Sequence, residues 1–532
     1  AHVLRAKFEL GLFEHPFVDA DSAAAINGSA EHLALARQAA RESIVLLENE
    51  RSTLPFPSST RALAVIGVDA AEARLGGYSG PGVHPVSIVD GIRERLEATG
   101  SVRYEPGPGR ASREYTIVPA EQLSFTANGE IERGLQGEYF DNNTLAGTPK
   151  VVRTDQRIDF GWTLNSPARG IPFDWYSVRW TGRLAVPAGG QPVRRLGVEG
   201  NDGYRLWLDD KLVVDDWRKQ SYGSHLADVS LAPGSVHTIR LEYFESTGNA
   251  RVKLVWSDHA RGEDEGWRAS IDRAVEAAKA SDAAVVVAGV EEGEFRDRAL
   301  LSLPAHQEEL IERVAAVGKP TVVVLVGGSA ITMSPWLDRV GAVLDVWYPG
   351  EQGGLAVADV LFGDADPAGR LPITFPISEG QLPLYYDHKP TGRGDDYVEL
   401  TGQPLFPFGF GLSYSTFRYS NLSIDPADIA PTGTATVRFR VTNTGARAGD
   451  EVPQLYVRDL LASVARPVMQ LEAFTRLHLA PGESREVAFT LSKEQFQMLD
   501  RDLHWVVEPG AFRVMVGASS KDIRLRGALV VQ

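Results

Sequence analysis

The chain has 532 residues, of which 43% are hydrophobic and 23% charged, so it can form several apolar cores in about three or four domains. Its net charge of −16 disfavours nucleic acid and anionic membrane surfaces as partners, and its lack of cysteine excludes disulfides, zinc–thiolate sites and cysteine nucleophiles. The longest aliphatic stretch, residues 283–290, is far shorter than the roughly 20 residues of a membrane span.

Residues 31–131 begin with the pattern of an α/β domain. Ser29 is a predicted helix N-cap, and apolar residues at helical spacing predict a helix that extends to Leu47. A buried strand is predicted over residues 61–70, and the glycine-rich loop LGGYSGPG and a helix in VSIVDGIRERL follow it. The loop fits either a plain connection or a phosphate cradle, although the lysine of a P-loop does not follow it.

Residues 132–258 have an all-β pattern that is rich in tryptophan and tyrosine. YRLWLDDKLVV predicts two strands joined by a tight turn at Asp209 and Asp210, and HTIRLEYFE and ARVKLVW predict two more. We therefore expect a β-sandwich inserted into a surface loop of the α/β domain, because such loops tolerate insertions. Its aromatic side chains fit either a sandwich core or platforms that stack on sugar rings.

Two further segments complete the predicted fold. In residues 259–416, the strands DAAVVVAGV, TVVVLVGG and AVLDVWYPG alternate with helices, which predicts a parallel sheet covered on both faces. Residues 417–532 alternate with a period of two, as in TVRFRVT, which predicts a terminal β-sandwich. The predicted fold class is multidomain: an α/β/α sandwich, interrupted by an inserted β-sandwich and followed by a second one.

The most informative stretch is GVEEGEFRDRALLSLP, where Glu291, Glu292 and Glu294 come just after a predicted buried strand. Open α/β sheets bind ligands outside the carboxyl ends of their strands. A carboxylate there, between an aromatic and a basic residue, is a candidate general acid with a pKa tuned by its surroundings. A solvated acidic loop, whose charges pair with their neighbours, fits the local sequence as well.

Other polar motifs lack the spacing of metal sites. HQEEL, which begins at His306, has no second histidine of a zinc helix, and the stretch from Asp364 to Asp366 lacks the rest of an EF-hand loop and predicts a turn. The sequence implies no cofactor and no metal.

Several specific stretches resemble one known family. They are LRAKFELGLFEHPFVD, AARESIVLLENERSTLPF, LGGYSG, EGEFRDRALLSLPAHQEEL, WYPGEQGGLAVADVLFGDADPAGRLPITFP and PLFPFGFGLSYSTF. Together they resemble the carboxyl-terminal part of family 3 glycoside hydrolases, the β-glucosidase and β-xylosidase group. Residues 417–532 are similar to the fibronectin type III-like domain of that family.

The insert, with GLQGEYFDNN and GNDGYRLWLDD, is similar to the protective-antigen-type sandwich of some β-glucosidases. Asn201 stands where an acidic residue is common in that sandwich, which argues against calcium binding by its loop. In relatives, such an insert can border the outer substrate subsites, and we expect the same arrangement here.

The resemblance implies retaining hydrolysis by two carboxylates roughly 5 Å apart. One is an aspartate nucleophile on a (β/α)8 barrel, and the other is a glutamate acid/base on the α/β sandwich. Alignment of EGEFRDR with the family's acid/base loop assigns the acid/base to Glu294, with Glu292 as the runner-up. The implied substrates are β-glucosides or short oligosaccharides, with β-xylosides as the near alternative and a non-catalytic carbohydrate-binding fragment as another.

The barrel itself is expected to lie outside this sequence. A (β/α)8 barrel needs about 250 residues, whereas residues 1–30 are similar only to its end and to a linker, and they show neither an initiator methionine nor a signal peptide. We expect the barrel on a second polypeptide, formed by nicking, or lost by truncation, and without the nucleophile the chain should be inactive. The sequence is compatible with a homodimer and with periplasmic, secreted or cytoplasmic locations.

Overall fold

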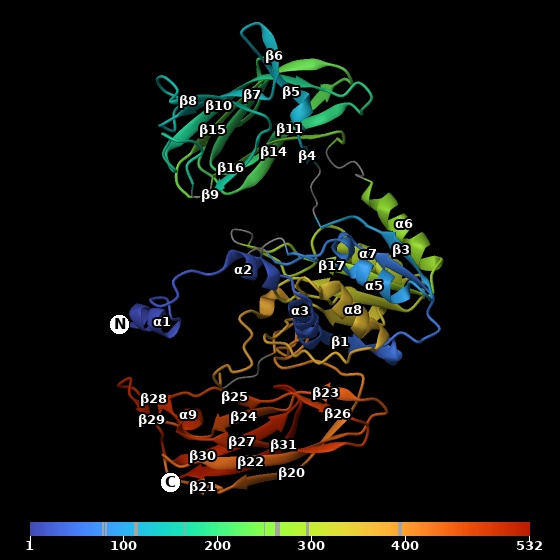
Figure 1. Cartoon of the computed structure of the whole chain (residues 1–532), viewed down its shortest axis with the longest axis vertical. Coiled ribbons are helices and arrows are strands. Elements are labelled where there is room, and N and C mark those ends of the chain that lie inside the picture. Colours follow the sequence, from blue (N-terminus) through green and yellow to red (C-terminus); the bar gives the residue numbers. More distant parts are fainter. Residues whose placement is uncertain are drawn as a thin grey trace. The chain divides into compact units, whose positions relative to one another are not determined.

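The computed structural model describes residues 1–76, 79, 82–110, 115–163, 165–248, 250–260, 266–293, 297–391 and 396–532 (Figure 1). It divides the chain into two compact units, one formed by Ala1–Ala111 and Trp267–Gln532 and the other by Ser112–Gly266. The α/β domain is thus interrupted by an independent unit, as the sequence predicts.

A six-stranded sheet with the order β1-β19-β18-β17-β2-β3 forms the centre of the first unit. Four of its five pairings are parallel, and β1 is antiparallel to β19. Its strands are β1 (Val45–Asn49), β2 (Ala62–Ile66), β3 (Ser101–Glu105), β17 (Ala283–Gly289), β18 (Thr321–Val326) and β19 (Ala342–Asp345). Every residue of β17 and β18 is buried, because helices cover both faces of the sheet.

The covering helices form two layers. The helices α3 (Ala30–Ser43), α5 (Ile88–Leu96) and α8 (Gly353–Phe362) pack with Val285 and Val324 on one face. The helices α6 (Trp267–Lys279) and α7 (Gln307–Ala315) pack with Val286 and Val323 on the other. The predicted α/β/α arrangement is confirmed. Shorter helices are α1 (His2–Glu9), α2 (Ala20–Ile26), α4 (Val68–Ala71), η1 (Glu50–Ser52), η3 (Leu337–Arg339) and η4 (Glu379–Gln381).

The helix predicted to extend to Leu47 ends earlier. Ser29 caps α3 as predicted, since its Oγ accepts a hydrogen bond from the His32 N–H at 3.4 Å, but the helix stops at Ser43. The following residues form β1, where Leu46 and Leu47 are buried. The β-branched residues at 44 and 45 favour a strand, and hydrogen bonding to β19 overrides the helical spacing.

The strand predicted over residues 61–70 is also shorter. It ends at Ile66, because Gly67 adopts a φ of 117° and the chain turns into α4. A Cβ atom at Gly67 would lie only 1.9 Å from the carbonyl oxygen of Val287, so a larger residue would push β2 and β17 apart. This turn carries Asp69 to the carboxyl edge of the sheet.

The second unit is a β-sandwich of an eight-stranded and a five-stranded sheet. The larger sheet contains β5 (Leu123–Ala127), β6 (Glu130–Arg133), β7 (Leu135–Phe140), β8 (Val151–Asp155), β10 (Tyr176–Ala185), β12 (Gly203–Leu208), β13 (Lys211–Asp216) and β15 (Val236–Glu245). The smaller contains β4 (Thr116–Ile117), β9 (Asp159–Thr163), β11 (Val193–Gly200), β14 (Gly223–Leu231) and β16 (Ala250–Ser257), and η2 is Ala120–Gln122. The unit extends beyond the predicted residues 132–258 on both sides. As predicted, Asp209 and Asp210 form the turn between β12 and β13, both with positive φ.

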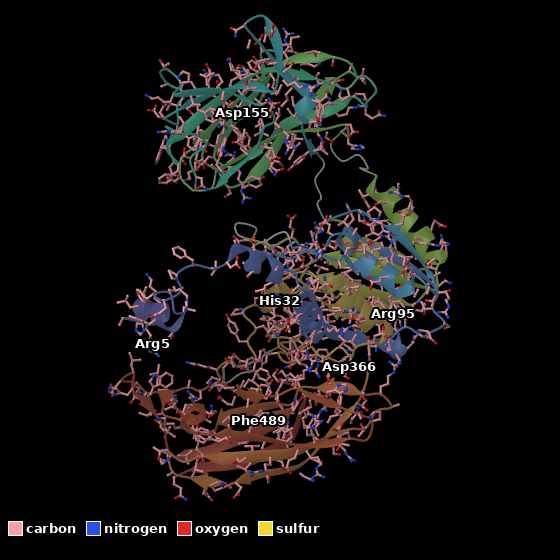
Figure 2. The ribbon with its side chains drawn as sticks, viewed as in Figure 1. Arg5, His32, Arg95, Asp155, Asp366 and Phe489 are labelled. Atoms are coloured by element: carbon pink, nitrogen blue, oxygen red, sulfur yellow. The ribbon has the colours of Figure 1, made fainter. Side chains whose placement is uncertain are left out.

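Most aromatic residues of this sandwich belong to its core. Asp155, labelled in Figure 2, accepts hydrogen bonds from the Tyr139 hydroxyl at 2.6 Å and the Trp180 indole N–H at 2.7 Å, while Arg153 contacts its other oxygen at 2.8 Å. Both rings are fully buried, and the carboxylate satisfies their polar groups. Trp175, in contrast, is 56% exposed.

The C-terminal sandwich combines a three-stranded and a five-stranded sheet with two short strand pairs. Its elements are β20 (Phe417–Asp425), β21 (Asp428–Ile429), β22 (Ala435–Asn443), β23 (Gly449–Glu451), β24 (Gln454–Asp459), β25 (Gln470–Phe474), β26 (Leu477–Leu479), β27 (Ser484–Leu491), α9 (Lys493–Phe496), β28 (Met498–Leu499), β29 (Trp505–Val506), β30 (Gly510–Gly517) and β31 (Ile523–Val531). Asp366, labelled in Figure 2, joins it to the α/β domain by accepting hydrogen bonds from Ser413 Oγ at 2.7 Å and the Asp450 N–H at 2.9 Å.

The N-terminal segment presents its apolar side chains to solvent. In α1, Val3 is 72% and Phe8 is 64% exposed, and farther along Phe17 is 91% exposed. Arg5, labelled in Figure 2, forms an ion pair of 2.9 Å with Glu9 on the same helix. Over the described residues, no helix has both the length and the apolar composition of a membrane span.

Candidate active site

The carboxyl edge of the six-stranded sheet contains a topological switch point. From β2 the chain continues to β3 on one side, whereas from β17 it continues to β18 and β19 on the other. The loops that follow β2 and β17 therefore leave the sheet in opposite directions, and in open α/β sheets ligands bind in the crevice between such loops. The acidic segment predicted as a site follows β17 and therefore begins at this switch point.

The start of the acidic segment is fixed by Gln307, the first residue of α7. Its side chain accepts a hydrogen bond from the Gly289 N–H at 2.8 Å and donates one to the Gly289 carbonyl at 2.9 Å. Gln307 is 4% exposed, so both bonds are shielded from water. A Cβ atom at Gly289 would lie 2.3 Å from the Val326 carbonyl oxygen. The last residue of β17 is therefore held in one position.

A buried cluster of charges joins the loops on both sides of the switch point. Arg74 donates to the Val290 carbonyl at 2.6 Å and to Asp69 at 2.9 Å, and Arg110 donates to the same Asp69 oxygen at 2.5 Å. Asp69 is 1% exposed, so two arginines surround a carboxylate that water hardly reaches. The cluster connects the loops after β2, β3 and β17.

Glu292, the runner-up acid/base, is held by groups from three loops. Its carboxylate accepts hydrogen bonds from the Gly328 N–H at 2.5 Å, from the Ser329 hydroxyl and from the Tyr348 hydroxyl at 3.4 Å. Arg298 lies 3.7 Å away as an ion-pair partner. Gly328 and Ser329 follow β18 and Tyr348 follows β19, so this side chain links the ends of β17, β18 and β19.

Glu294, the predicted acid/base, lies outside the described residues, as do residues 295 and 296. The chain that follows it is anchored to the edge of the sheet. The Thr332 N–H donates to the Leu301 carbonyl at 3.0 Å, and the Leu301 N–H donates to the Glu379 carboxylate. The described residues on both sides of Glu294 are therefore attached to the same edge.

A buried carboxyl group lies at this edge. Asp345, the last residue of β19, is 3% exposed and accepts a hydrogen bond from the Trp347 N–H at 3.1 Å. Burial raises the pKa of Asp345 to about 8, and the nearby charge of Glu292 raises it further. The group is thus largely neutral at pH 7, and it supports a turn in which Trp347 has a left-handed φ of 54°.

The raised pKa of Asp345 predicts a specific dependence of stability on pH. Between its ordinary value of 3.8 and about 8, the folded chain keeps a proton that the unfolded chain loses, so this group lowers the free energy of unfolding by about 1.4 kcal/mol for each unit that the pH rises. We expect Asp345→Asn to remove this slope, so that the stability of the variant relative to the wild type increases as the pH rises from 5 to 8, as measured by scanning calorimetry. Parallel curves for the two proteins would contradict a neutral Asp345.

Glu351 clamps the glycine-rich loop that follows β2. Its carboxylate accepts hydrogen bonds from the N–H groups of Val83 and His84, and Gln352 donates to the His84 carbonyl at 2.9 Å. The Arg74 guanidinium lies 5.3 Å from the centre of the Tyr348 ring in the same region. Residues 77, 78, 80 and 81 of the loop lie outside the described residues, so the phosphate-cradle alternative stays untested.

The other sequence candidates have structural contacts. The His306 ring stacks on Trp267 at a centroid distance of 3.6 Å. Asn201 donates to Glu245 at 3.1 Å and accepts from the Arg251 N–H at 2.6 Å, so both ends of its amide are engaged within the insert. In the part of the chain that the structure describes, no group of three or more histidine, aspartate or glutamate side chains is arranged to hold a metal ion.

Sequence reasoning finds the acidic segment but misses most of the residues that hold it. Asp69, Gln307, Asp345 and Glu351 are not singled out by any motif spacing. One signal was available for Asp345, because a carboxylate within the apolar run AVLDVW is unusual for a buried strand. Each of the others has at least one partner that is distant in the sequence: Arg110 for Asp69, Gly289 for Gln307 and Val83 for Glu351.

Comparison with known proteins identifies two domains. The family model described as glycosyl hydrolase family 3 C-terminal domain matches residues 44–414, and that of the fibronectin type III-like domain matches residues 451–520. The first match includes all five loops described above, which follow β2, β3, β17, β18 and β19 at the carboxyl edge of the sheet.

Similar proteins are β-glycosidases by name. A β-glucosidase of Rhizobium radiobacter is 34% identical over 527 residues, covering 93% of this chain and 62% of that protein. A β-xylosidase of Formosa agariphila is 46% identical over 255 residues, covering 47% and 35%. The crystal structure of a Kluyveromyces marxianus β-glucosidase in complex with glucose aligns with a TM-score of 0.68 and 27% identity, covering 95% of this chain and 63% of that one.

The chain spans between about a third and just under two thirds of the length of these relatives. The match over residues 44–414 covers more than half of the chain, and it agrees with the α/β/α architecture and with the motifs at the edge of the sheet. The chain therefore belongs to glycosyl hydrolase family 3: it contains the C-terminal α/β domain of that family, followed by a fibronectin type III-like domain.

Proposed function

We propose that this chain supplies the acid/base half of a retaining β-glycosidase and that Glu294 is the acid/base. The observation that carries the proposal is the acidic segment at the switch point of a family 3 α/β domain, anchored on both sides of Glu294. In retaining hydrolysis this residue protonates the leaving oxygen and later activates water, so it needs a fixed position at a binding crevice. The chemistry needs no cofactor.

The nucleophile in this proposal is an aspartate on a (β/α)8 barrel outside the 532 residues. Within the described ranges, the mainly parallel sheet of the α/β domain has six strands, and a barrel would need eight. The exposed apolar side chains of α1 and of residues 10–18 fit docking on such a barrel. The barrel can belong to a separate polypeptide or to a longer form of this chain.

The substrate is proposed to be a β-glucoside or a short β-linked glucose oligosaccharide, cleaved from its end. The glucosidase relative that aligns with nearly the whole chain supports this choice. A β-xylosidase of the same family is the second candidate, and the 46% identity to the Formosa agariphila enzyme favours it. The inserted sandwich, proposed to be of the protective-antigen type, would border the outer subsites, and its exposed Trp175 is available for contact with a sugar.

The test begins with a denaturing mass spectrum of the purified material, which tells whether a polypeptide of barrel size accompanies this chain. The chain is then assayed with the barrel present, on aryl β-glucosides and aryl β-xylosides. We expect hydrolysis only with the barrel, and faster hydrolysis of the glucoside. Glycan binding without hydrolysis in the presence of the barrel would contradict the proposal and favour a non-catalytic carbohydrate-binding role.

A further inference from the structure

A cavity of about 500 Å³ is lined by residues of both the α/β domain and the C-terminal sandwich. Most of its lining comes from residues 383–391 and 396–404, which follow η4, and from residues 468–469 and 520–521 of the sandwich. Its volume lies within the range of small-molecule sites, about 300–1,000 Å³. None of the side chains described above at the carboxyl edge of the sheet belongs to the described lining, so the cavity has no role in the proposed hydrolysis.

Two tyrosine side chains that line this cavity are largely open to solvent. Tyr385 is 66% exposed and Tyr397 is 47% exposed. A single exposed apolar side chain is ordinary on a protein surface, but here two aromatic rings line one cavity. A tyrosine offers an apolar ring face together with a hydroxyl group. The pair therefore suits a ligand that has both apolar faces and hydroxyl groups.

The segment that carries the first exposed ring is held to the sandwich. The ring of Tyr386 stacks on Phe408 at a centroid distance of 4.1 Å, and its hydroxyl accepts a hydrogen bond from the Leu471 N–H at 3.2 Å. Two residues later, the His388 carbonyl accepts from the Val468 N–H at 2.9 Å. These contacts fix the backbone beside the exposed ring before any ligand binds.

The segment that carries the second exposed ring is held by buried and charged groups. Gln381 is 2% exposed, and its side-chain amide donates to the Thr401 carbonyl at 2.7 Å and to the Gln403 carbonyl at 3.0 Å. The Asp396 carboxylate accepts from the Gly402 N–H at 2.9 Å. Both aromatic walls are thus ordered in advance, which lowers the entropy that a ligand loses on binding.

The charges in the described lining do not favour an ionic ligand. Asp396 and Lys521 have opposite signs, and the remaining lining, apart from His388, is aromatic, apolar or neutral and polar. The hydroxyl groups of a sugar can donate to a carboxylate and accept from an ammonium group. The C–H faces of a sugar ring can stack on tyrosine. The cavity therefore fits a neutral sugar better than a phosphate or a cation.

We propose that this cavity binds a short neutral oligosaccharide of β-linked sugars, which stacks on Tyr385 and Tyr397. The choice of β-linked sugars rests on the proposed function, because β-glucosides and β-xylosides are its candidate substrates. The cavity itself is independent of the acid/base assignment. Such a site lets the chain retain a glycan without cleaving it.

The first test titrates the 532-residue chain alone with cellotetraose and with xylotetraose in a calorimeter. We expect saturable binding, which Tyr385→Ala weakens about tenfold because the stacking face is lost, whereas Tyr385→Phe, which keeps the ring, stays within about twofold of the wild type. Trp505→Ala is the matched control, since it removes a ring of β29 that is 65% exposed and outside the described lining. It should leave the affinity unchanged. Circular dichroism verifies that each variant is folded.

A second measurement locates the bound sugar. Lys521 is exposed and lines the cavity, so bound cellotetraose should make it react several times more slowly with acetic anhydride, as followed by mass spectrometry. Lys493, which is 58% exposed elsewhere in the same sandwich, should react at an unchanged rate. The protection of Lys521 should disappear in Tyr385→Ala.

Three results would overturn the inference. One is the absence of saturable binding of either tetraose, and another is binding that persists unchanged in both Tyr385→Ala and Tyr397→Ala. The third is equally tight binding of maltotetraose, whose sugars are α-linked. Binding of either β-linked tetraose with the expected dependence on Tyr385 supports the inference, and the tighter one identifies the sugar. Failure of the proposed function has a different signature: no hydrolysis with the barrel present, while binding that depends on Tyr385 is still obtained.

Discussion

Replacing Glu294 with alanine, in the enzyme that includes the barrel, is expected to lower turnover of glycosides with poor leaving groups by about 10²- to 10⁴-fold. Such substrates need a proton on the departing oxygen, and alanine cannot supply one. Activated aryl glycosides leave without full protonation, so their bond cleavage should be much less affected. Steady-state assays on a series of aryl glycosides with different leaving-group pKa values measure the difference.

The control for this prediction is chemical. Azide is a small nucleophile that can replace the activated water, so it should accelerate breakdown of the glycosyl-enzyme in Glu294→Ala and give a β-glycosyl azide. Wild-type enzyme should show no such acceleration. Equal losses on good and poor leaving groups, without azide rescue, would count against Glu294 as the acid/base.

Replacing Asp69 with alanine is expected to produce the largest loss of stability. The side chains of Arg74 and Arg110 are 12% and 16% exposed, and both pair with this carboxylate, although Arg110 also contacts Glu72 at 2.7 Å. Removing one partner of a buried ion pair leaves the other charge uncompensated, which typically costs about 3–5 kcal/mol. Chemical denaturation of the α/β domain, followed by circular dichroism, measures the change.

A matched variant separates this effect from the loss of any carboxylate. Glu276→Ala on α6 removes an exposed partner of Lys279, and we expect a change within about 0.5 kcal/mol. If Asp69→Ala behaved like Glu276→Ala, the Asp69 cluster would not be an important support of the sheet edge.

The regular part of the α/β domain follows from local sequence. The runs AAVVVAG and TVVVLV are too apolar and too β-branched for a surface, so they predict buried parallel strands, and β17 and β18 are such strands. The residue at which α3 ends, in contrast, cannot be predicted from local sequence. The helical spacing through Leu47 is real in the sequence, but pairing of β1 with β19 buries these residues as a strand.

The candidate site, like the fold, is only partly predicted by the sequence. An acidic segment directly after a buried strand predicts a carboxylate at the carboxyl edge of the sheet, and residues 291–293 lie there. The roles of Gln307 and Asp69 do not follow from the sequence, because Gly289 and Arg110 lie 18 and 41 residues from them and become their neighbours only when the sheet assembles. No local sequence pattern distinguishes a glutamine or an aspartate that will form a buried hydrogen bond or ion pair with a distant residue.

The sequence by itself determined the α/β/α class, the inserted and terminal sandwiches and the family, because periodicity and contiguous motifs are local properties of the chain. Only the tertiary structure decided that β2 and β17 flank the switch point, that Asp345 keeps its proton and that Glu292 is held by donors from three loops. These properties depend on burial and on charges brought together by the folded sheet, and neither is encoded in the order of neighbouring residues.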